Sequence, residues 1–233
     1  MSNETRYWLS RIGSVCAIAG ALLAAVGNIL HPVTPRDDPV GVARVIAESG
    51  SWTLIHEVIT LGVILMFLGL IGIGASIGGG ASGALARLGV YAATVGTTLG
   101  LATVILDGVG AKQLADQWAA APESTKATAL SLVSMNETLN FALAGLFNLS
   151  FAGVPFILLG LAVALNGVYP RWLGWIAVFA GLGSVAAGLV QAFTGEPTVA
   201  SLVLTIIGPT IISLWVLVMG VLMGRRATRA PSS

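Results

Sequence analysis

Residues 139–165 are LNFALAGLFNLSFAGVPFILLGLAVAL, an apolar stretch without a charged side chain. About 20 apolar residues are enough for an α-helix to cross the hydrocarbon core of a bilayer. Backbone groups cannot stay unpaired in lipid, and the stretch lacks the alternation of polar and apolar residues that barrel strands show. We therefore predict that it forms a membrane-spanning helix.

Five other stretches have the same character, and together with the first they predict six spans. They cover residues 12–30, 58–77, 88–106, 172–193 and 199–223. Across the 233 residues, 56% are hydrophobic and 9% are charged, compared with roughly 25% charged in soluble domains. The spans use most of this length, so we expect one domain over residues 1–233. The predicted fold class is all-α, an integral membrane bundle of six transmembrane helices.

Basic residues are distributed unequally between the two ends of the predicted bundle. Seven lie on the side that carries both termini: Arg6, Arg11, Arg87, Arg171, Arg225, Arg226 and Arg229. Four lie on the opposite side: Arg36, Arg44, Lys112 and Lys126. Short basic segments stay in the cytoplasm, so we expect both termini there. Nine arginines beside two lysines, in a chain rich in Ala and Gly, indicate a bacterial protein of the inner membrane.

Composition also excludes some partners and sites. The formal net charge is +1 and the sequence has no basic stripe, so we expect no nucleic-acid partner. Cys16 is the single cysteine, which excludes an internal disulfide and a thiolate-rich metal cluster. The partner that the hydropathy predicts is the lipid bilayer.

Small residues recur four positions apart within several spans. These sets are Ala17-Ala21-Ala25, Gly96-Gly100, Ala177-Gly181 and Gly220-Gly224. Such spacing lets helix backbones approach closely in lipid. We expect these faces to pack within the bundle, and homo-oligomerisation through one of them is the alternative.

The two predicted outer loops, 31–53 and 107–138, are long and contain helix signals. In the first, Asp38 is suited to cap a helix that begins at Pro39 and stops at Gly50. In the second, Leu114 and Trp118 lie four residues apart, on one face of a helix. We predict short interfacial helices in both loops, which form a lid on the outer face.

Acidic residues and both histidines gather at the outer ends of the spans. Nine of the ten carboxylates lie there: Asp37, Asp38, Glu48, Glu57, Asp107, Asp116, Glu123, Glu137 and Glu196. On the fourth span, two amides continue a polar stripe from Glu137 into the bilayer. We predict an outward-facing polar funnel. Its expected ligand-binding residues are His31, His56, Glu57, Asp107, Glu137, Asn140 and Asn148.

Three interpretations of this funnel stay open. In the first, the interfacial groups are simply solvated, and the protein has a structural or partner-binding role. In the second, the funnel binds or transports a cation or a small amphipathic ligand, because an acidic mouth concentrates cations. In the third, the chain is a membrane-embedded enzyme that acts on a lipidic substrate.

The enzyme interpretation has two forms with different residues. His31, His56 and Glu57 would ligate a divalent metal cofactor for a hydrolase. Alternatively, Asp107 or Glu137 would be the catalytic acid of a cyclase or isomerase. Residue spacing adds no support, because position 60 is Thr and the HExxH motif is therefore absent.

At the start of the fifth span stands Pro170-Arg171-Trp172-Leu173-Gly174-Trp175. This segment resembles an uncharacterised family of small bacterial six-helix integral membrane proteins, a domain of unknown function. Residues 52–56 and Asp107-Gly108 look similar to that family as well. The resemblance implies a bacterial inner-membrane protein and brings no activity and no functional residues. Independently of it, an arginine beside two tryptophans is typical of an anchor at the membrane interface.

Overall fold

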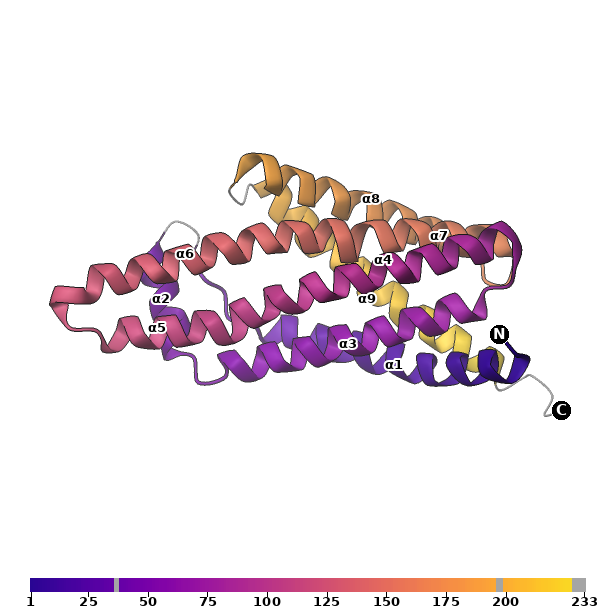
Figure 1. The fold of residues 1–233 in the computed structure, drawn as a ribbon, viewed down its shortest axis with the longest axis horizontal. Coiled ribbons are helices and arrows are strands. Elements are labelled where there is room, and N and C mark those ends of the chain that lie inside the picture. The colour runs from indigo at the N-terminus through magenta and orange to yellow at the C-terminus, as the bar shows by residue number, and fades with distance from the viewer. Residues whose placement is uncertain (36–37, 196–198, 228–233) are drawn as a thin grey trace.

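The computed structural model describes residues 1–35, 38–195 and 199–227, and over these residues the chain is all-α (Figure 1). Six helical stretches are long and apolar enough to cross a membrane. They comprise α1 (Asn3–Leu30), α3 (Trp52–Ser76), Gly80–Ala120, Glu123–Asn166, α8 (Arg171–Thr194) and residues Ile207–Ala227 of α9 (Val199–Ala227). The chain is therefore a multi-pass membrane protein with the six-helix architecture that the sequence predicted.

Two of the spans are composite helices. The third consists of α4 (Gly80–Ile105), the π-helical turn η1 (Leu106–Gly110) and α5 (Ala111–Ala120). The fourth consists of α6 (Glu123–Phe147), the π-helical turn η2 (Asn148–Gly153) and α7 (Val154–Asn166). Both continue well beyond the apolar stretches, because a helix can extend into polar sequence once it leaves the lipid.

The second outer segment differs from the predicted loop. Residues 107–138 form a helical hairpin, in which α5 and the first half of α6 extend the third and fourth spans. The turn falls at Ala121 and Pro122, since proline lacks the N–H that a continuing helix would need. An ion pair between Lys112 and Asp116, one helical turn apart, supports α5.

The predicted interfacial helix in the first outer loop is present as α2 (Pro39–Glu48). Asp38 caps it, since its carboxylate accepts a hydrogen bond of 2.9 Å from the backbone N–H of Gly41. Its apolar face packs against α5 and the start of α3 in a small cluster with Val42, Ile46 and Trp52 at the centre. Together α2, α5 and the α5–α6 turn form what we name the hairpin end. The start of α1 and the end of α9 lie at the other end, the terminal end (Figure 1).

The small-residue faces are used for packing inside the chain. An added Cβ at Gly96 would lie 2.3 Å from the Ser150 carbonyl oxygen, and one at Gly220 would lie 2.9 Å from the Cβ of Ala17. Ala177 and Gly181 are buried, whereas Ala25 is exposed. These contacts bring α1, α4 and α9 close to their neighbours and position the side chains that project between them.

Large apolar side chains fill the centre of the bundle toward the terminal end. Phe156, Leu159, Trp215 and Met219 are almost completely buried. Four charged residues whose positions at the bundle ends were predicted from the sequence lie outside the described residues: Arg36, Asp37, Glu196 and Arg229.

Candidate functional site

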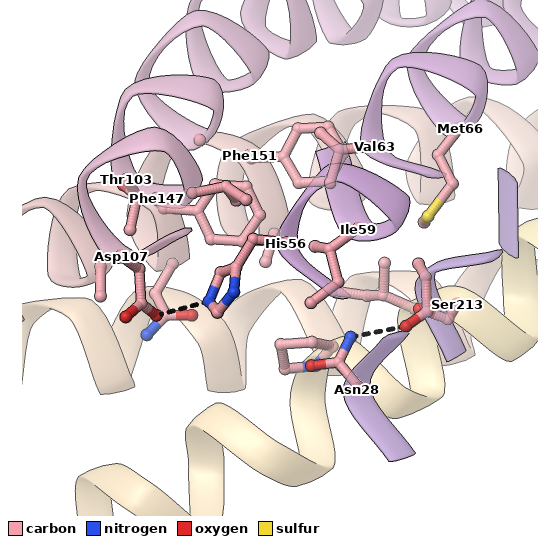
Figure 2. A pocket seen from close by; sticks show the side chains of 18 of the residues that line it. Asn28, His56, Ile59, Val63, Met66, Thr103, Asp107, Phe147, Phe151 and Ser213 are labelled. Atoms are coloured by element: carbon pink, nitrogen blue, oxygen red, sulfur yellow. Dashed lines mark hydrogen bonds and ion pairs between the residues drawn. The ribbon is translucent and has the colours of Figure 1, made fainter. Parts of the chain in front are cut away.

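Three side chains from separate elements converge near the hairpin end. His31 follows the last residue of α1, His56 lies in the second turn of α3, and Asp107 lies in η1. The His56 Nε2 atom is 3.3 Å from Asp107 Oδ2, and the His31 Nε2 atom is 4.0 Å from the same oxygen. One ligand atom from each residue lies within 4.8 Å of the other two. Figure 2 shows His56 and Asp107 facing each other.

Hydrogen bonds orient both imidazole rings in the same way. The Nδ1 atom of His31 is 2.8 Å from the Pro32 carbonyl oxygen, and that of His56 is 2.8 Å from the Trp52 carbonyl oxygen. A carbonyl oxygen only accepts, so Nδ1 carries the proton in each ring. In the neutral form, each Nε2 then has a free lone pair. Metal-binding histidines are commonly held by such a bond from the second ring nitrogen.

The Nε2 atom of His56 is buried, and its contact with Asp107 Oδ2 at 3.3 Å is within ion-pair distance but does not meet hydrogen-bond geometry. Its side chain is 4% exposed, whereas those of His31 and Asp107 are each 28% exposed. Leaving a buried polar atom unpaired costs free energy. The cluster therefore combines one buried acceptor with two groups that a ligand can reach.

The charge state of His31 suits a ligand role. Burial lowers the pKa of His31 below its usual 6.5, against the opposing effect of the Asp107 carboxylate, and His56 acts in the same direction as burial. A lowered pKa keeps the imidazole neutral near pH 7. Only the neutral ring has a lone pair to offer.

The π-helical turn η1 places Asp107 beside His56. A π turn inserts an extra residue and leaves backbone carbonyls without their usual helical partner. Here the Trp52 indole N–H donates to the Asp107 carbonyl at 2.7 Å. The Leu106 carbonyl accepts from the backbone N–H of Ala111 and also from the Asn136 amide at 3.3 Å. The backbone that carries the carboxylate is thus tied to both α3 and α6.

Close packing between η1 and α3 depends on Gly108. A Cβ added there would lie 2.4 Å from the Cβ of His56, a distance that real structures do not allow. The Trp52 ring lies against both imidazoles, with centroids 4.8 Å from His31 and 5.0 Å from His56. Glycine on one side and an indole on the other hold the two histidines in place.

A cavity of about 320 Å³ extends from these residues into the bundle. His31, His56 and Asp107 line it near the hairpin end. Apolar side chains, including Ile59, Val63, Met66, Phe147 and Phe151, make up most of the remaining wall (Figure 2). Asn28, Thr103, Asn148 and Ser213 add polar groups along its length. The cavity is therefore polar at one end and largely apolar beyond it.

The other predicted site residues lie in different surroundings. Glu57 is exposed, because it follows His56 on α3 and neighbouring helical residues point about 100° apart. Asp107, not Glu57, therefore completes the cluster with the two histidines. Asn148 lines the cavity and its amide donates to Gln191 Oε1 at 2.9 Å. Asn140 does not line it, although its Oδ1 atom is buried and has no hydrogen-bond partner within the described ranges.

Glu137 is close enough to Asp107 for the two carboxyl groups to interact electrostatically. Its Oε1 atom is buried and has no hydrogen-bond partner within the described chain. Trp52, Gly108 and Asn136 hold the site together, although no motif in the sequence predicted a role for them.

No protein-family model matches this chain, and no curated protein and no solved structure is significantly similar to it. The resemblance seen at residues 170–175 stays a prediction. The geometry of the His31, His56 and Asp107 cluster is thus the basis for a proposed function.

Proposed function

We propose that this protein binds a divalent metal ion, Zn²⁺, and holds a small amphipathic molecule in the cavity beside it. The ligands are Nε2 of His31, Nε2 of His56 and a carboxylate oxygen of Asp107. The observation that carries the proposal is the convergence of these atoms while both Nδ1 atoms are engaged by backbone carbonyls. Each ring is thereby set to present its free nitrogen to the same point.

The donor set and its spacing fit zinc. Zinc bonds to His nitrogen and carboxylate oxygen are about 2.0–2.2 Å long, so tetrahedral neighbours are roughly 3.4 Å apart. His56 and Asp107 are already at 3.3 Å, whereas His31 lies 4.0 Å from Asp107 and the three ligand atoms lie within 4.8 Å of one another. Tetrahedral spacing therefore requires His31 to move inward by roughly 0.6–1.4 Å. His31 follows the last residue of α1, where a change in backbone conformation costs little free energy. Three protein ligands leave one coordination position open.

The cavity favours an amphipathic ligand. Its polar end would receive a headgroup at the metal, and its apolar wall would bury a short hydrocarbon chain beside Met66, Phe147 and Phe151. Its volume of about 320 Å³ is roughly that of ten water-sized groups. Beyond it, Leu70, Phe156 and Met219 are buried in a packed apolar core. That core favours retention of a ligand over passage of a hydrated cation.

Hydrolysis is the second candidate function, and Glu137 is the observation that favours it. A zinc ion held by these residues would lower the pKa of a bound water to near neutral. Glu137 does not line the cavity, but its carboxyl group interacts with Asp107 and has a buried oxygen without a hydrogen-bond partner among the described residues, so Glu137 would be the nearby base. Three protein ligands with one open position are typical of catalytic zinc sites.

The proposed location is the bacterial inner membrane, with both termini in the cytoplasm. This proposal rests on the positive-inside rule. In the described part of the chain, six arginines lie toward the terminal end, namely Arg6, Arg11, Arg87, Arg171, Arg225 and Arg226. Three basic residues, Arg44, Lys112 and Lys126, lie toward the hairpin end. The metal centre would then face the outer leaflet.

Zinc content of the purified chain tests the metal. Protein stripped with a chelator, reloaded with Zn²⁺ and desalted should retain one zinc per chain by plasma mass spectrometry. His56→Ala and Asp107→Asn should each weaken zinc binding at least tenfold, because each removes one of three ligands. Glu57→Gln is the matched control and should bind normally. Equal zinc retention in Asp107→Asn and the wild type would overturn the proposal.

A pair of hydroxamates tests the ligand cavity, since a hydroxamate head binds zinc. Octanohydroxamate, which has a hydrocarbon chain, should bind the zinc-loaded protein at least tenfold more tightly than acetohydroxamate. Ala144→Leu places a larger side chain in the cavity wall and should remove this preference without reducing zinc content. If both hydroxamates bind equally to the wild type, the cavity does not hold a chain.

A further inference from the structure

A second cavity, of about 240 Å³, lies at the terminal end and shares no lining residue with the metal-site cavity. The start of α1, the end of α3, the segment before α8 and the end of α9 surround it. Two arginines, Arg6 and Arg226, line it, and none of its lining residues is acidic. This cavity is a concave site with positive charge and no carboxylate to neutralise it.

Neither guanidinium has a carboxylate within salt-bridge distance among the described residues. Glu4, the acidic residue nearest to Arg6 in sequence, is exposed and does not line the cavity. The N-terminus of α1 adds to the positive potential, because Asn3 and Arg6 of its first turns face the cavity. An anion would therefore find charge and hydrogen-bond donors together.

The floor of the cavity is built from ordered polar groups. The Tyr169 hydroxyl donates to Ser76 Oγ at 2.8 Å, and Ser76 donates to the Ile73 carbonyl at 2.7 Å. Tyr169 is buried, and burial raises the pKa of its hydroxyl, which keeps it uncharged. The guanidinium carbon of Arg226 lies 5.4 Å from the centre of the Tyr169 ring. A cation over a fixed aromatic ring is itself held in place.

Arg6 also lines a neighbouring cavity of about 450 Å³. That cavity adds Arg87 together with apolar side chains such as Leu9, Ile71 and Val90. Cationic groups thus lie beside apolar surface at the ends of membrane-spanning helices. A molecule with an anionic head and a hydrocarbon tail matches this combination.

We propose that the terminal-end cavity binds a phosphate group, with Arg6 and Arg226 as its donors. Guanidinium groups bind phosphate through paired hydrogen bonds, and two of them here converge on one cavity. A phospholipid of the surrounding leaflet and soluble inorganic phosphate both carry this chemistry. The site is independent of the metal centre and does not rest on the proposed metal function.

Native mass spectrometry of the full chain in detergent tests this site, with phosphatidylglycerol, phosphatidylcholine and inorganic phosphate as probes. Wild-type protein should retain phosphatidylglycerol in preference to phosphatidylcholine. Arg6→Gln and Arg226→Gln should each weaken retention at least fivefold. Arg11→Gln removes one charge from the same end but lines neither cavity, so it should weaken retention less than twofold.

The probes distinguish the two sources of phosphate. If millimolar inorganic phosphate binds and displaces the lipid, the site stands and its occupant is soluble phosphate. Equal losses in Arg226→Gln and Arg11→Gln would mean diffuse attraction to a basic surface and would overturn the proposal. Circular dichroism and size-exclusion profiles that match the wild type ensure that each variant is folded.

Discussion

His56 illustrates how surroundings decide the role of one side chain. An isolated histidine at the start of a membrane span is ordinarily hydrated. Nothing in the sequence around His56 distinguishes such a histidine from one that binds a metal. In the structure it is buried against Gly108, bonded through Nδ1 to Trp52, and directed with Nε2 toward Asp107. A residue without a side chain, Gly108, therefore controls the position of this histidine.

Gly108→Ala should displace His56 and damage the metal centre. The new methyl group would meet the His56 Cβ at 2.4 Å, and neither helix backbone can easily retreat. Overpacking of this kind costs about 1–3 kcal/mol. We expect a lower thermal unfolding midpoint in detergent and zinc binding at least tenfold weaker.

Gly183→Ala is the control for that substitution, because no heavy atom lies within 4 Å of a Cβ placed there. Its unfolding midpoint should stay unchanged or rise slightly, since alanine favours the helix more than glycine does. Zinc binding as tight in Gly108→Ala as in the wild type would contradict the role assigned to this glycine.

The two π-helical turns are the elements that shape the cavity. η1 carries Asp107, and η2 includes the cavity residues Asn148 and Phe151. Pro155 is the second residue after η2 and cannot donate the backbone bond that a regular helix requires, so an interruption near it was predictable. No proline marks η1, although Gly108 and Gly110 lie within it. Its extra residue depends instead on partners from α3 and α6, whose side chains bond to its carbonyls.

Trp52→Phe should weaken η1 while keeping an aromatic ring against the two histidines. Phenylalanine keeps the apolar contact with both histidines but loses the indole donor to the Asp107 carbonyl. An unsatisfied carbonyl costs about 1–3 kcal/mol. We expect hydrogen exchange to rise in residues 106–110 and zinc affinity to fall by a factor of three to ten.

Trp172→Phe is the matched control, since Trp172 is exposed at the opposite end of the bundle. Trp172→Phe should change neither the hydrogen exchange of residues 106–110 nor the zinc affinity. Unchanged exchange in η1 of Trp52→Phe would show that the indole bond does not hold the turn.

At the scale of the whole molecule, the two ends have opposite chemistry. Among the described residues, the hairpin end carries both histidines and every carboxylate except Glu4, whereas six of the seven described arginines lie at the terminal end. An apolar core that includes Phe156, Trp215 and Met219 lies between them. The proposed metal centre and the proposed phosphate site therefore lie at opposite ends of the bundle.

Cysteine labelling in bacterial spheroplasts tests the orientation, in a Cys16→Ala background that has no other thiol. Ser124→Cys at the hairpin end should react with a membrane-impermeant maleimide added outside. Ala81→Cys at the terminal end should react only after the membrane is permeabilised, because the proposed orientation puts that end in the cytoplasm. The reverse pattern would place the metal centre in the cytoplasm.

Several features of the fold follow from local properties of the chain. Transfer of about 20 apolar residues into lipid depends on their composition alone, so the six spans were predictable. The cap at Asp38 and the interfacial helix after it depend on a few adjacent residues, and they were predictable too. The polar character of the hairpin end was likewise visible in the positions of His31, His56 and Glu137 along the spans.

The grouping of His31 and His56 with Asp107, and the exclusion of Glu57, depend on contacts between distant parts of the chain. Helix rotation is set by which faces pack, and one extra residue in η1 rotates the helix that follows it by about 100° relative to a regular helix. Single-chain patterns contain no record of that rotation. It arises where Gly108 meets α3 and the indole of Trp52 bonds to η1, and those long-range contacts create the site.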